Sequence, residues 1–205
     1  MSDDPLPDDV PDDELVARIA GRDRAALSAL FRRRQSDVYR VAMLMIGSSA
    51  AAEDVTQEVF LAVMDGAGRF DATRASVAAW LCGIARNHAR RRLDRERRML
   101  PVRELPEPRI DATVQPDALQ ELSRAEQIES LRRAVLNLPF RYREVVVLCD
   151  LQELSYVDAA AALECSVGTV RSRLNRGRAL LAAKMRAHGT APAVAAAKKI
   201  SRCLA

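Results

Sequence analysis

The spacing of apolar residues predicts helices along most of the chain. Apolar positions recur every three or four residues, and no stretch shows the sustained alternation of a half-buried strand. The first helix should start with Asp12 or Asp13 as its N-cap and stop near Gly21. The other expected helices span 24–46, 51–65 and 77–98, then a segment from near Ser123 to the pause at Leu138-Pro139, and 141–151, 156–163 and 167–186. We therefore predict an all-α protein.

A proline-rich stretch divides these helices into two small helical domains joined by a flexible linker. Residues 99–122 hold four prolines, five acids and two bases, which is typical of a linker. The predicted organisation is an acidic disordered arm (1–12), an N-terminal domain (13–98), a linker (99–129), a C-terminal helix-turn-helix domain (130–186) and a tail of unknown role (187–205).

Composition limits the class of protein. In this chain of 205 residues, no apolar run approaches the roughly 18–20 residues that a membrane span needs, and the acidic N-terminus does not resemble a signal peptide. The four cysteines are scattered without a CxxC pair, so we expect neither a disulfide framework nor a metal site. We predict a cytoplasmic protein without cofactor, whose cysteines act as small buried apolar residues.

Charge is unevenly distributed along the chain. Residues 1–14 hold seven acids and no base, 86–98 hold seven arginines and two acids, and 167–186 hold six bases and no acid. Two separate basic stretches indicate two contacts with a polyanion, although charge alone is equally consistent with two solvated helix faces.

The segment 155–181 has the pattern of a helix-turn-helix. Ser155 is placed to cap a short alanine-rich helix, 164–166 form a tight turn, and a second helix follows. Its inward face carries Val167, Val170, Leu174, Gly177 and Leu181. Its outward face carries Gly168, Thr169, Ser172, Asn175 and Arg176, flanked by Arg171, Arg173 and Arg178. Small polar groups beside arginine suit the major groove of DNA, whereas the alternative is a helical hairpin with a solvated basic face.

Two helices of the N-terminal domain present different faces. On 51–65, Asp54, Gln57, Glu58 and Leu61 share a face that predicts an exposed leucine within a polar patch, suited to docking a protein. On 77–98, Arg86 and Arg90 lie opposite the apolar stripe, Asn87 lies at its margin, and Arg91 extends the basic run. Phe70, in the preceding loop, either plugs the core or stacks on an unpaired base.

Five segments, in this order, resemble the extracytoplasmic-function (ECF) sigma factors of bacteria. They are AEDVTQEVF (52–60), RFD (69–71), AWLCGIARN (79–87), LPFRYREVVVLCDLQELSY (138–156) and VGTVRSRLNRGRALL (167–181). The resemblance covers about 13–98 and 130–186. It implies a dissociable subunit of RNA polymerase that helps open promoter DNA for transcription initiation, and it implies no catalytic residue.

The resemblance also implies roles for residues. Asp54, Gln57, Glu58 and Leu61 would dock on the β′ clamp helices of core RNA polymerase, which the chain also contacts through the β subunit. The opened −10 element would be bound by Phe70, Asp71, Asn87, Arg90 and Arg91. The duplex −35 element would be read by Thr169, Arg171, Ser172, Arg173, Asn175, Arg176 and Arg178. The resemblance also implies that an anti-sigma factor binds the chain and that the free chain is a monomer.

Two other classes of protein remain as alternatives. The first is a helix-turn-helix transcriptional regulator with a ligand- or protein-binding N-terminal domain, which would bind its operator tightly without polymerase. The second is an enzyme, which needs a converged nucleophile, base or metal cluster. The two histidines lie in unrelated segments, so we expect no enzymatic activity.

Overall fold

The computed structural model describes residues 9–99 and 119–187. The predicted arm up to residue 8, the linker from 100 to 118 and the tail from 188 lie outside the described residues. Within the described ranges all regular structure is helical, and none of the helices is both long and apolar enough to cross a membrane.

The first helices of the N-terminal domain begin and end at residues with clear local causes. Asp23 caps α2 by accepting hydrogen bonds from the amides of Ala25 (2.9 Å) and Ala26 (3.1 Å), and Gly47 ends it with a left-handed φ of 86°. The helices of this domain are α1 (Asp12–Ala20), α2 (Arg24–Ile46), α3 (Ser49–Gly66), the 3₁₀ turn η1 (Ala67–Arg69) and α4 (Val77–Met99).

The predicted N-cap of the first helix is wrong by one position. Pro11 is the N-cap of α1, and Asp12 is its first helical residue. The carboxylate of Asp12 instead accepts hydrogen bonds of 2.6 Å from both Arg33 and Arg34 of α2. The side chain of Asp12, which the local pattern predicts to cap α1, therefore forms ion pairs with the next helix instead.

The C-terminal domain contains the predicted helix-turn-helix. Ser155 caps α7 by accepting a hydrogen bond of 3.0 Å from the amide of Asp158, and Glu164 turns the chain with a φ of 52°. The elements are α5 (Leu119–Leu136), α6 (Phe140–Val146), the π-helical turn η2 (Val147–Leu151), α7 (Tyr156–Ala162) and α8 (Val167–Ala187). Helix α5 thus begins inside the range predicted as linker, shortly after the last proline of that range.

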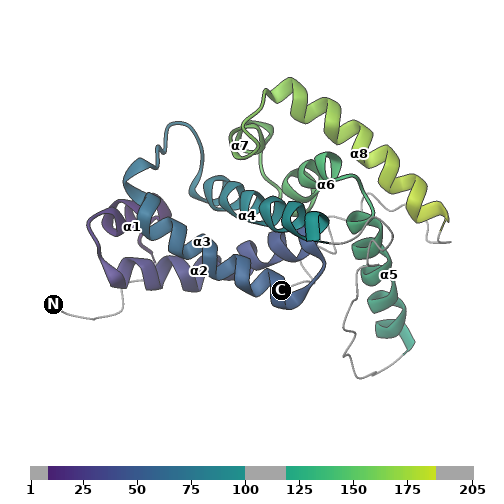
Figure 1. Ribbon diagram of the computed structural model, residues 1–205, viewed down its shortest axis with the longest axis horizontal. Coiled ribbons are helices and arrows are strands. Elements are labelled where there is room, and N and C mark those ends of the chain that lie inside the picture. The colour runs from purple at the N-terminus through teal and green to yellow at the C-terminus, as the bar shows by residue number, and fades with distance from the viewer. Residues whose placement is uncertain (1–8, 100–118, 188–205) are drawn as a thin grey trace.

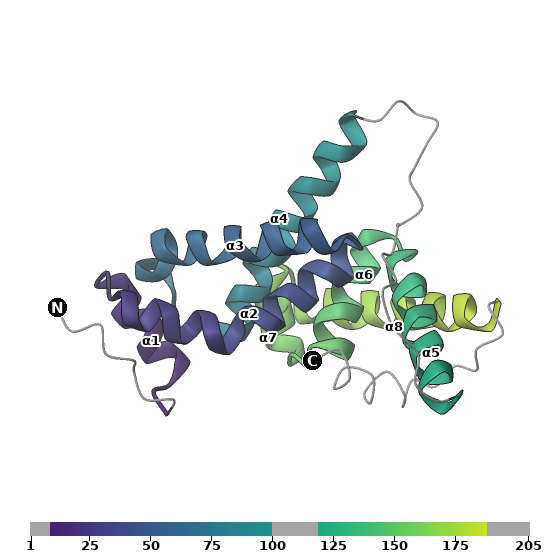
Figure 2. The same ribbon diagram turned by 90° about the horizontal axis from the view of Figure 1, so that it is seen from below.

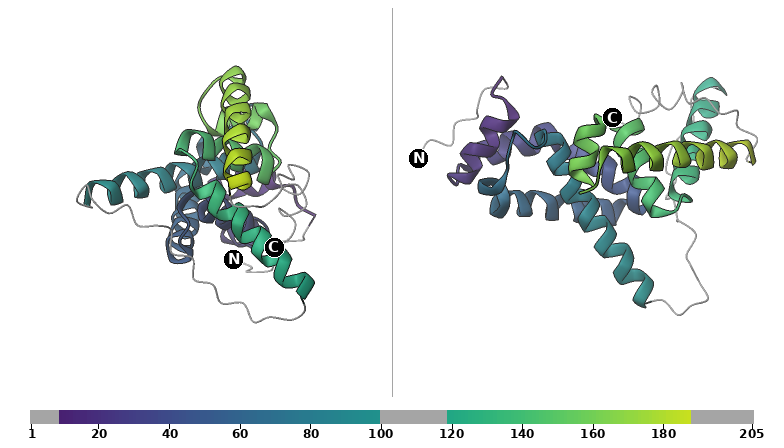
Figure 3. Two further views of the ribbon diagram at one scale, coloured as in Figure 1. Left: turned by 90° about the vertical axis from the view of Figure 1, so that its right-hand side faces the viewer. Right: turned by 90° about the horizontal axis from the view of Figure 1, so that it is seen from above.

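The two domains pack against each other. Helix α4 lies between α2 and α3 on one side and the C-terminal helices on the other (Figure 1), where it packs against α7. Helix α2 also contacts α5, α6 and η2. The C-terminal half of α4 projects beyond the bundle (Figure 2), and α4, α5 and α8 point in different directions (Figure 3).

Close packing of α8 on α6 depends on the absence of a side chain at Gly177. A Cβ atom there would lie 2.8 Å from Cγ2 of Val146 and 3.2 Å from the carbonyl oxygen of Tyr142. A branched side chain and a backbone atom cannot easily move away, so any larger residue would displace α8.

We predict that Gly177→Ala destabilises the C-terminal domain. Overpacking costs about 1–3 kcal/mol, against a gain of about 1 kcal/mol in helix propensity. Chemical denaturation followed by circular dichroism should show a net loss. Gly168→Ala is the matched control in the same helix, because its Cβ would meet only Oγ of Ser166, at 3.7 Å. A Gly177→Ala protein as stable as the control would contradict the packing argument.

Candidate polymerase- and DNA-binding surfaces

The outer face of α3 has the composition that the sequence predicts. Val55 and Val59 are fully buried, whereas Asp54, Gln57 and Glu58 are exposed. Leu61 is 61% exposed, and Met64, one turn further along, is 52% exposed. Sequence reasoning missed Met64, which extends the exposed apolar spot.

The acids of this face are paired with α4. Nδ1 of His88 lies 2.7 Å from Glu58, and Arg92 donates a hydrogen bond of 2.9 Å to Asp54. Polar contacts therefore join the candidate protein-docking helix to the helix that carries the basic run. Such exposed pairs contribute about 0–1 kcal/mol each, so a partner could displace them at little cost.

The loop before α4 places its aromatic residue against the start of that helix. Phe70 is half-buried, and its ring centroid lies 5.0 Å from that of Trp80. Asp71 is exposed, and its pKa is lowered because it accepts hydrogen bonds from the hydroxyl (2.6 Å) and amide (2.9 Å) of Thr73. Phe70 thus packs on the core and also lines a surface cleft with Asp71.

Further along α4, the basic face is divided between solvent and protein. Arg90 and Arg91 are exposed. Arg86 is buried, because the C-terminal domain covers this side of α4. Its Nη1 donates a hydrogen bond of 2.8 Å to Oδ1 of the half-buried Asn87.

Glu144 of α6 is the partner of Arg86. Its side chain is 2% exposed, and Oε2 accepts a hydrogen bond of 2.8 Å from Nε of Arg86. Its other oxygen accepts one of 3.3 Å from Arg173 of α8. This carboxylate therefore joins α4 to α8. The sequence signal was an acid directly before the apolar run 145–148, where a carboxylate can be buried only if it is paired.

The outward face of α8 matches the prediction. Val170 and Leu174 are fully buried, while the opposite side faces solvent. Its exposed side chains are Arg171, Ser172, Asn175 and Arg176, and Thr169 is half-buried. Thr169 and Ser166 lie 2.9 Å apart through their hydroxyls, which orders the start of the helix.

Two of the arginines predicted to bind DNA are held by carboxylates of their own domain. Arg173 pairs with Glu144, and Arg178 donates from Nε to Asp150 across 3.0 Å. Asp150 also raises the pKa of Arg178, so the guanidinium stays charged. Both contacts fix α8 on the domain.

Further polar contacts connect the two domains. The amide and hydroxyl of Ser76, just before α4, donate to Asp158 of α7 across 3.0 and 2.9 Å. Arg143 of α6 donates to the carbonyl of Met45 in the last turn of α2, and also to Leu138 at 3.1 Å. Burial lowers the pKa of Arg143 to about 10. Carbonyls at helix ends lack a helical partner, so the arginine satisfies them.

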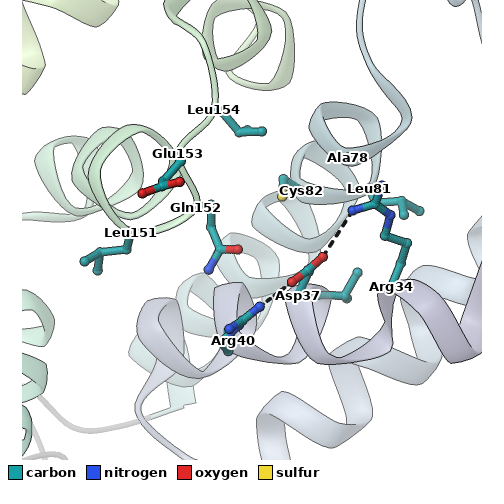
Figure 4. Close-up of a pocket in the computed structure, with 11 residues that line it drawn as sticks. Arg34, Asp37, Arg40, Ala78, Leu81, Cys82, Leu151, Gln152, Glu153 and Leu154 are labelled. Carbon is teal, nitrogen blue, oxygen red and sulfur yellow. Dashed lines mark hydrogen bonds and ion pairs between the residues drawn. The ribbon is translucent and has the colours of Figure 1, made fainter. Parts of the chain in front are cut away.

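The seam between the domains is not fully closed. A cleft of about 410 Å³ separates α2 and α4 from residues 151–154 (Figure 4). On its α2 side, Asp37 forms ion pairs with Arg34, at 3.3 Å, and with Arg40. Cys82 of α4 lines the same cleft but is only 4% exposed, and burial raises the pKa of its thiol to about 12.

The fold and these surfaces define a two-domain helical DNA-binding protein with a helix-turn-helix. Residues 30–99 match Sigma-70 region 2, and residues 128–181 match Sigma-70, region 4. The chain belongs to the ECF RNA polymerase sigma factors.

Individual relatives agree with this assignment. The ECF RNA polymerase sigma factor SigM of Mycobacterium tuberculosis (strain ATCC 25618 / H37Rv) is 37% identical over 175 residues, covering 83% of each chain. SigC of M. tuberculosis (strain CDC 1551 / Oshkosh) is 36% identical over 181 residues, covering 83% of this chain and 92% of SigC. The solved structure of CnrH in complex with the cytosolic domain of CnrY gives a TM-score of 0.62 at 28% identity, covering 86% of this chain and 97% of that chain.

These matches favour a sigma factor over the two alternatives that the sequence left open, a helix-turn-helix regulator and an enzyme. The N-terminal domain matches a sigma-factor region, which favours a sigma factor over a regulator with a ligand-binding domain. The relatives carry the names of sigma factors, not of enzymes. Within the described ranges, no three His, Cys, Asp or Glu side chains form a cluster that could hold a metal ion.

We predict that Cys82 and Cys149 resist alkylation in the folded protein. Burial raises the pKa of the Cys149 thiol to about 11 and that of Cys82 to about 12, so both are almost entirely protonated at pH 8. Iodoacetamide at pH 8, with sites mapped by mass spectrometry, should modify both thiols far more slowly in the folded protein than in denaturant. Equal rates in the folded and the denatured protein would contradict the burial.

Proposed function

We propose that the chain directs bacterial core RNA polymerase to promoters through three separate surfaces. The face of α3 with Asp54, Gln57, Glu58 and Leu61 docks on the β′ clamp helices. The loop with Phe70 and Asp71, together with Asn87, Arg90 and Arg91 of α4, binds the opened −10 element. Helix α8 reads the −35 element in the major groove. Transcription takes place in the cytoplasm, where we expect the protein to act.

The observation that carries this proposal is the exposed, acid-free face of α8, held by a helix-turn-helix. Ser172, Asn175 and Arg176 are exposed together on a helix whose opposite side is buried. Hydroxyl, amide and guanidinium groups recognise base edges, and guanidinium also contacts phosphate. Single-stranded DNA is bound differently, by stacking and by basic grooves, which suits the α4 surface.

Within α8, the arginines divide into two roles. Arg171 and Arg176 are exposed and can reach bases or phosphates, with the guanidinium of Arg171 lying 5.9 Å from the ring centroid of Tyr156. Arg173 and Arg178, which we expected among the DNA contacts, act chiefly as positioning residues through Glu144 and Asp150. Their side chains remain 34% and 38% exposed, which leaves room for a phosphate contact.

Regulation by an anti-sigma factor belongs to the same proposal. CnrH, the similar solved structure, was determined in complex with the cytosolic domain of CnrY. A partner that covers the exposed apolar spot of Leu61 and Met64 would prevent docking on polymerase.

The direct test is run-off transcription. The purified chain, mixed with sigma-free core polymerase and a library of genomic fragments from its host, should start RNA synthesis at defined upstream sequences. Core enzyme alone should not. Failure to start at any native sequence would refute the assignment of function.

We predict that Leu61→Asp weakens binding to core polymerase without unfolding the domain. A charge replaces an exposed apolar anchor, so burial against the partner is lost while the core is untouched. A pull-down with core enzyme should show the loss, with unchanged helicity by circular dichroism. Ala17→Asp, on the exposed face of α1, is the control. Capture of the Leu61→Asp chain at wild-type strength would contradict the docking surface.

We predict that Arg176→Ala reduces discrimination at the −35 element by about 1–3 kcal/mol. The measurement is transcription by the holoenzyme from promoters with the wild-type and a scrambled −35 sequence. Arg186→Ala removes an exposed arginine from the last turn of the same helix and should leave discrimination intact. Unchanged preference in the Arg176→Ala protein would count against this face as the reader.

A further inference from the structure

Five arginines from three helices surround one cavity beside the C-terminal half of α4. The cavity has a volume of about 320 Å³ and is lined by residues of α4, α6 and α8. Two carboxylates, those of Asp94 and Glu144, also line it, so the arginines outnumber the acids. A concave site with an excess of positive charge attracts anions. The arginines are Arg86, Arg90 and Arg97 of α4, Arg141 of α6 and Arg173 of α8.

The most buried of these arginines has hydrogen-bond donors without a protein partner. The side chain of Arg86 is 11% exposed. Within the described residues its guanidinium donates to Glu144 and to Asn87, at 2.8 Å each, and to no other group. A guanidinium has more N–H donors than these bonds use. Since a buried donor without an acceptor is costly, Arg86 favours an acceptor within the cavity that it lines.

The two carboxylates neutralise the cavity incompletely. Glu144 is shared, because its oxygens accept hydrogen bonds from Arg86 at 2.8 Å and from Arg173 at 3.3 Å. The ion pair of Arg90 with Asp94 spans 3.8 Å, and both side chains are about half exposed. An exposed pair of this kind contributes little to stability, so the guanidinium of Arg90 can turn toward an anion at little cost.

Arg97 and Arg141 supply the charge that the acids leave unpaired. Both are exposed, and neither forms an ion pair within the part of the chain that the structure describes. The guanidinium of Arg141 lies 4.8 Å from the ring centroid of Tyr142, which orients it. Burial and, to a smaller extent, the charge of Arg97 lower the pKa of the neighbouring Arg143 to about 10. This repulsion indicates an excess of positive charge at the end of α4.

The arrangement suits a compact anion with several phosphate groups. Arginine binds phosphate through parallel, charge-assisted hydrogen bonds. A chain of linked phosphates can contact the buried Arg86 and also the exposed Arg97 and Arg141. The volume lies within the range of small-molecule sites, roughly 300–1,000 Å³. A nucleic-acid strand lying on the surface would reach the exposed arginines but not the guanidinium of Arg86.

We propose that this cavity binds a small oligophosphate, a molecule with two or more linked phosphate groups such as pyrophosphate or the phosphate chain of a nucleotide. Arg86 and Arg173 bind the inner phosphate, and Arg90, Arg97 and Arg141 bind the outer ones. This site goes beyond the proposed function, because it does not depend on which promoter element α4 or α8 contacts.

Isothermal titration calorimetry of the full chain with inorganic pyrophosphate tests the site, in phosphate-free buffer at low salt. The wild type should bind a single pyrophosphate, and added salt should weaken the binding. Arg97→Ala and Arg141→Ala should each lower the affinity about tenfold, because each removes charge-assisted hydrogen bonds. Arg95→Ala removes an exposed arginine of α4 that does not line the cavity, so its affinity should stay within about twofold of the wild type.

Further arms of the titration identify the ligand. The side chains of Arg97 and Arg141 are exposed, so both variants should fold, and circular dichroism verifies this. Inorganic phosphate should bind about tenfold more weakly than pyrophosphate, since a single group reaches fewer arginines. ATP that binds more tightly than pyrophosphate would support a nucleotide as the ligand, and equal binding would support an inorganic one.

Three results would overturn the site. The first is a wild-type chain that does not bind pyrophosphate. The second is a loss of affinity in Arg95→Ala equal to that in Arg97→Ala, because the attraction would then be a general effect of charge. The third is a chain in which Arg97→Ala weakens binding to a short DNA duplex while pyrophosphate does not compete with that duplex. In that case these arginines would bind a nucleic-acid backbone.

Discussion

The arrangement of the two domains depends on the ion pairs of one buried carboxylate. Glu144 is buried at the start of the apolar run 145–148, where an unpaired charge would be strongly destabilising. Arg86 of the other domain takes one of its oxygens, and Arg173 of the recognition helix takes the other. Removing one partner of such a buried pair typically costs about 3–5 kcal/mol. The same side chain that fixes α8 on its domain thereby also fixes one domain on the other.

Apolar packing and polar contacts together hold the two domains. Each domain buries leucine and valine side chains, such as Leu30 and Val41 in the first and Leu148 and Leu174 in the second. These residues belong to one buried apolar cluster that includes both domains. Polar contacts, such as that of Ser76 with Asp158, add to it, and a cleft interrupts it. Apolar burial stabilises in proportion to area, whereas the polar contacts add orientation.

Helix α4 connects the three surfaces. Its outer side pairs with the acids of α3 through His88 and Arg92, and its other side carries Arg86 at the seam. The loop before it places Phe70 on Trp80. A partner that docks on α3 would therefore touch residues directly bonded to α4, the helix to which we assign the −10 element. The contacts are exposed and weak, so they adjust the orientation of side chains and do not hold the fold together.

The local pattern determined the helices and their faces. It predicted the start of α2 after Asp23, its end at Gly47, the exposure of Leu61 and the outward polar side of α8, because helix period, capping and turn residues act over a few positions. The five sequence motifs were likewise sufficient to identify the family, because each lies within a short segment of the chain. Asp12 shows the limit of local reasoning, since its carboxylate binds Arg33 of the next helix instead of capping its own.

Only the tertiary structure decided which basic residues are exposed. On a helical wheel Arg86 and Arg90 look alike, but Arg86 is buried against a carboxylate 58 residues later in the chain, and Arg90 is exposed. A wheel gives directions relative to one helix axis and cannot show which other helix lies in that direction. The packing of α4 on α7 is set by shape and charge over two domains, and this long-range match has no periodic signal in the sequence.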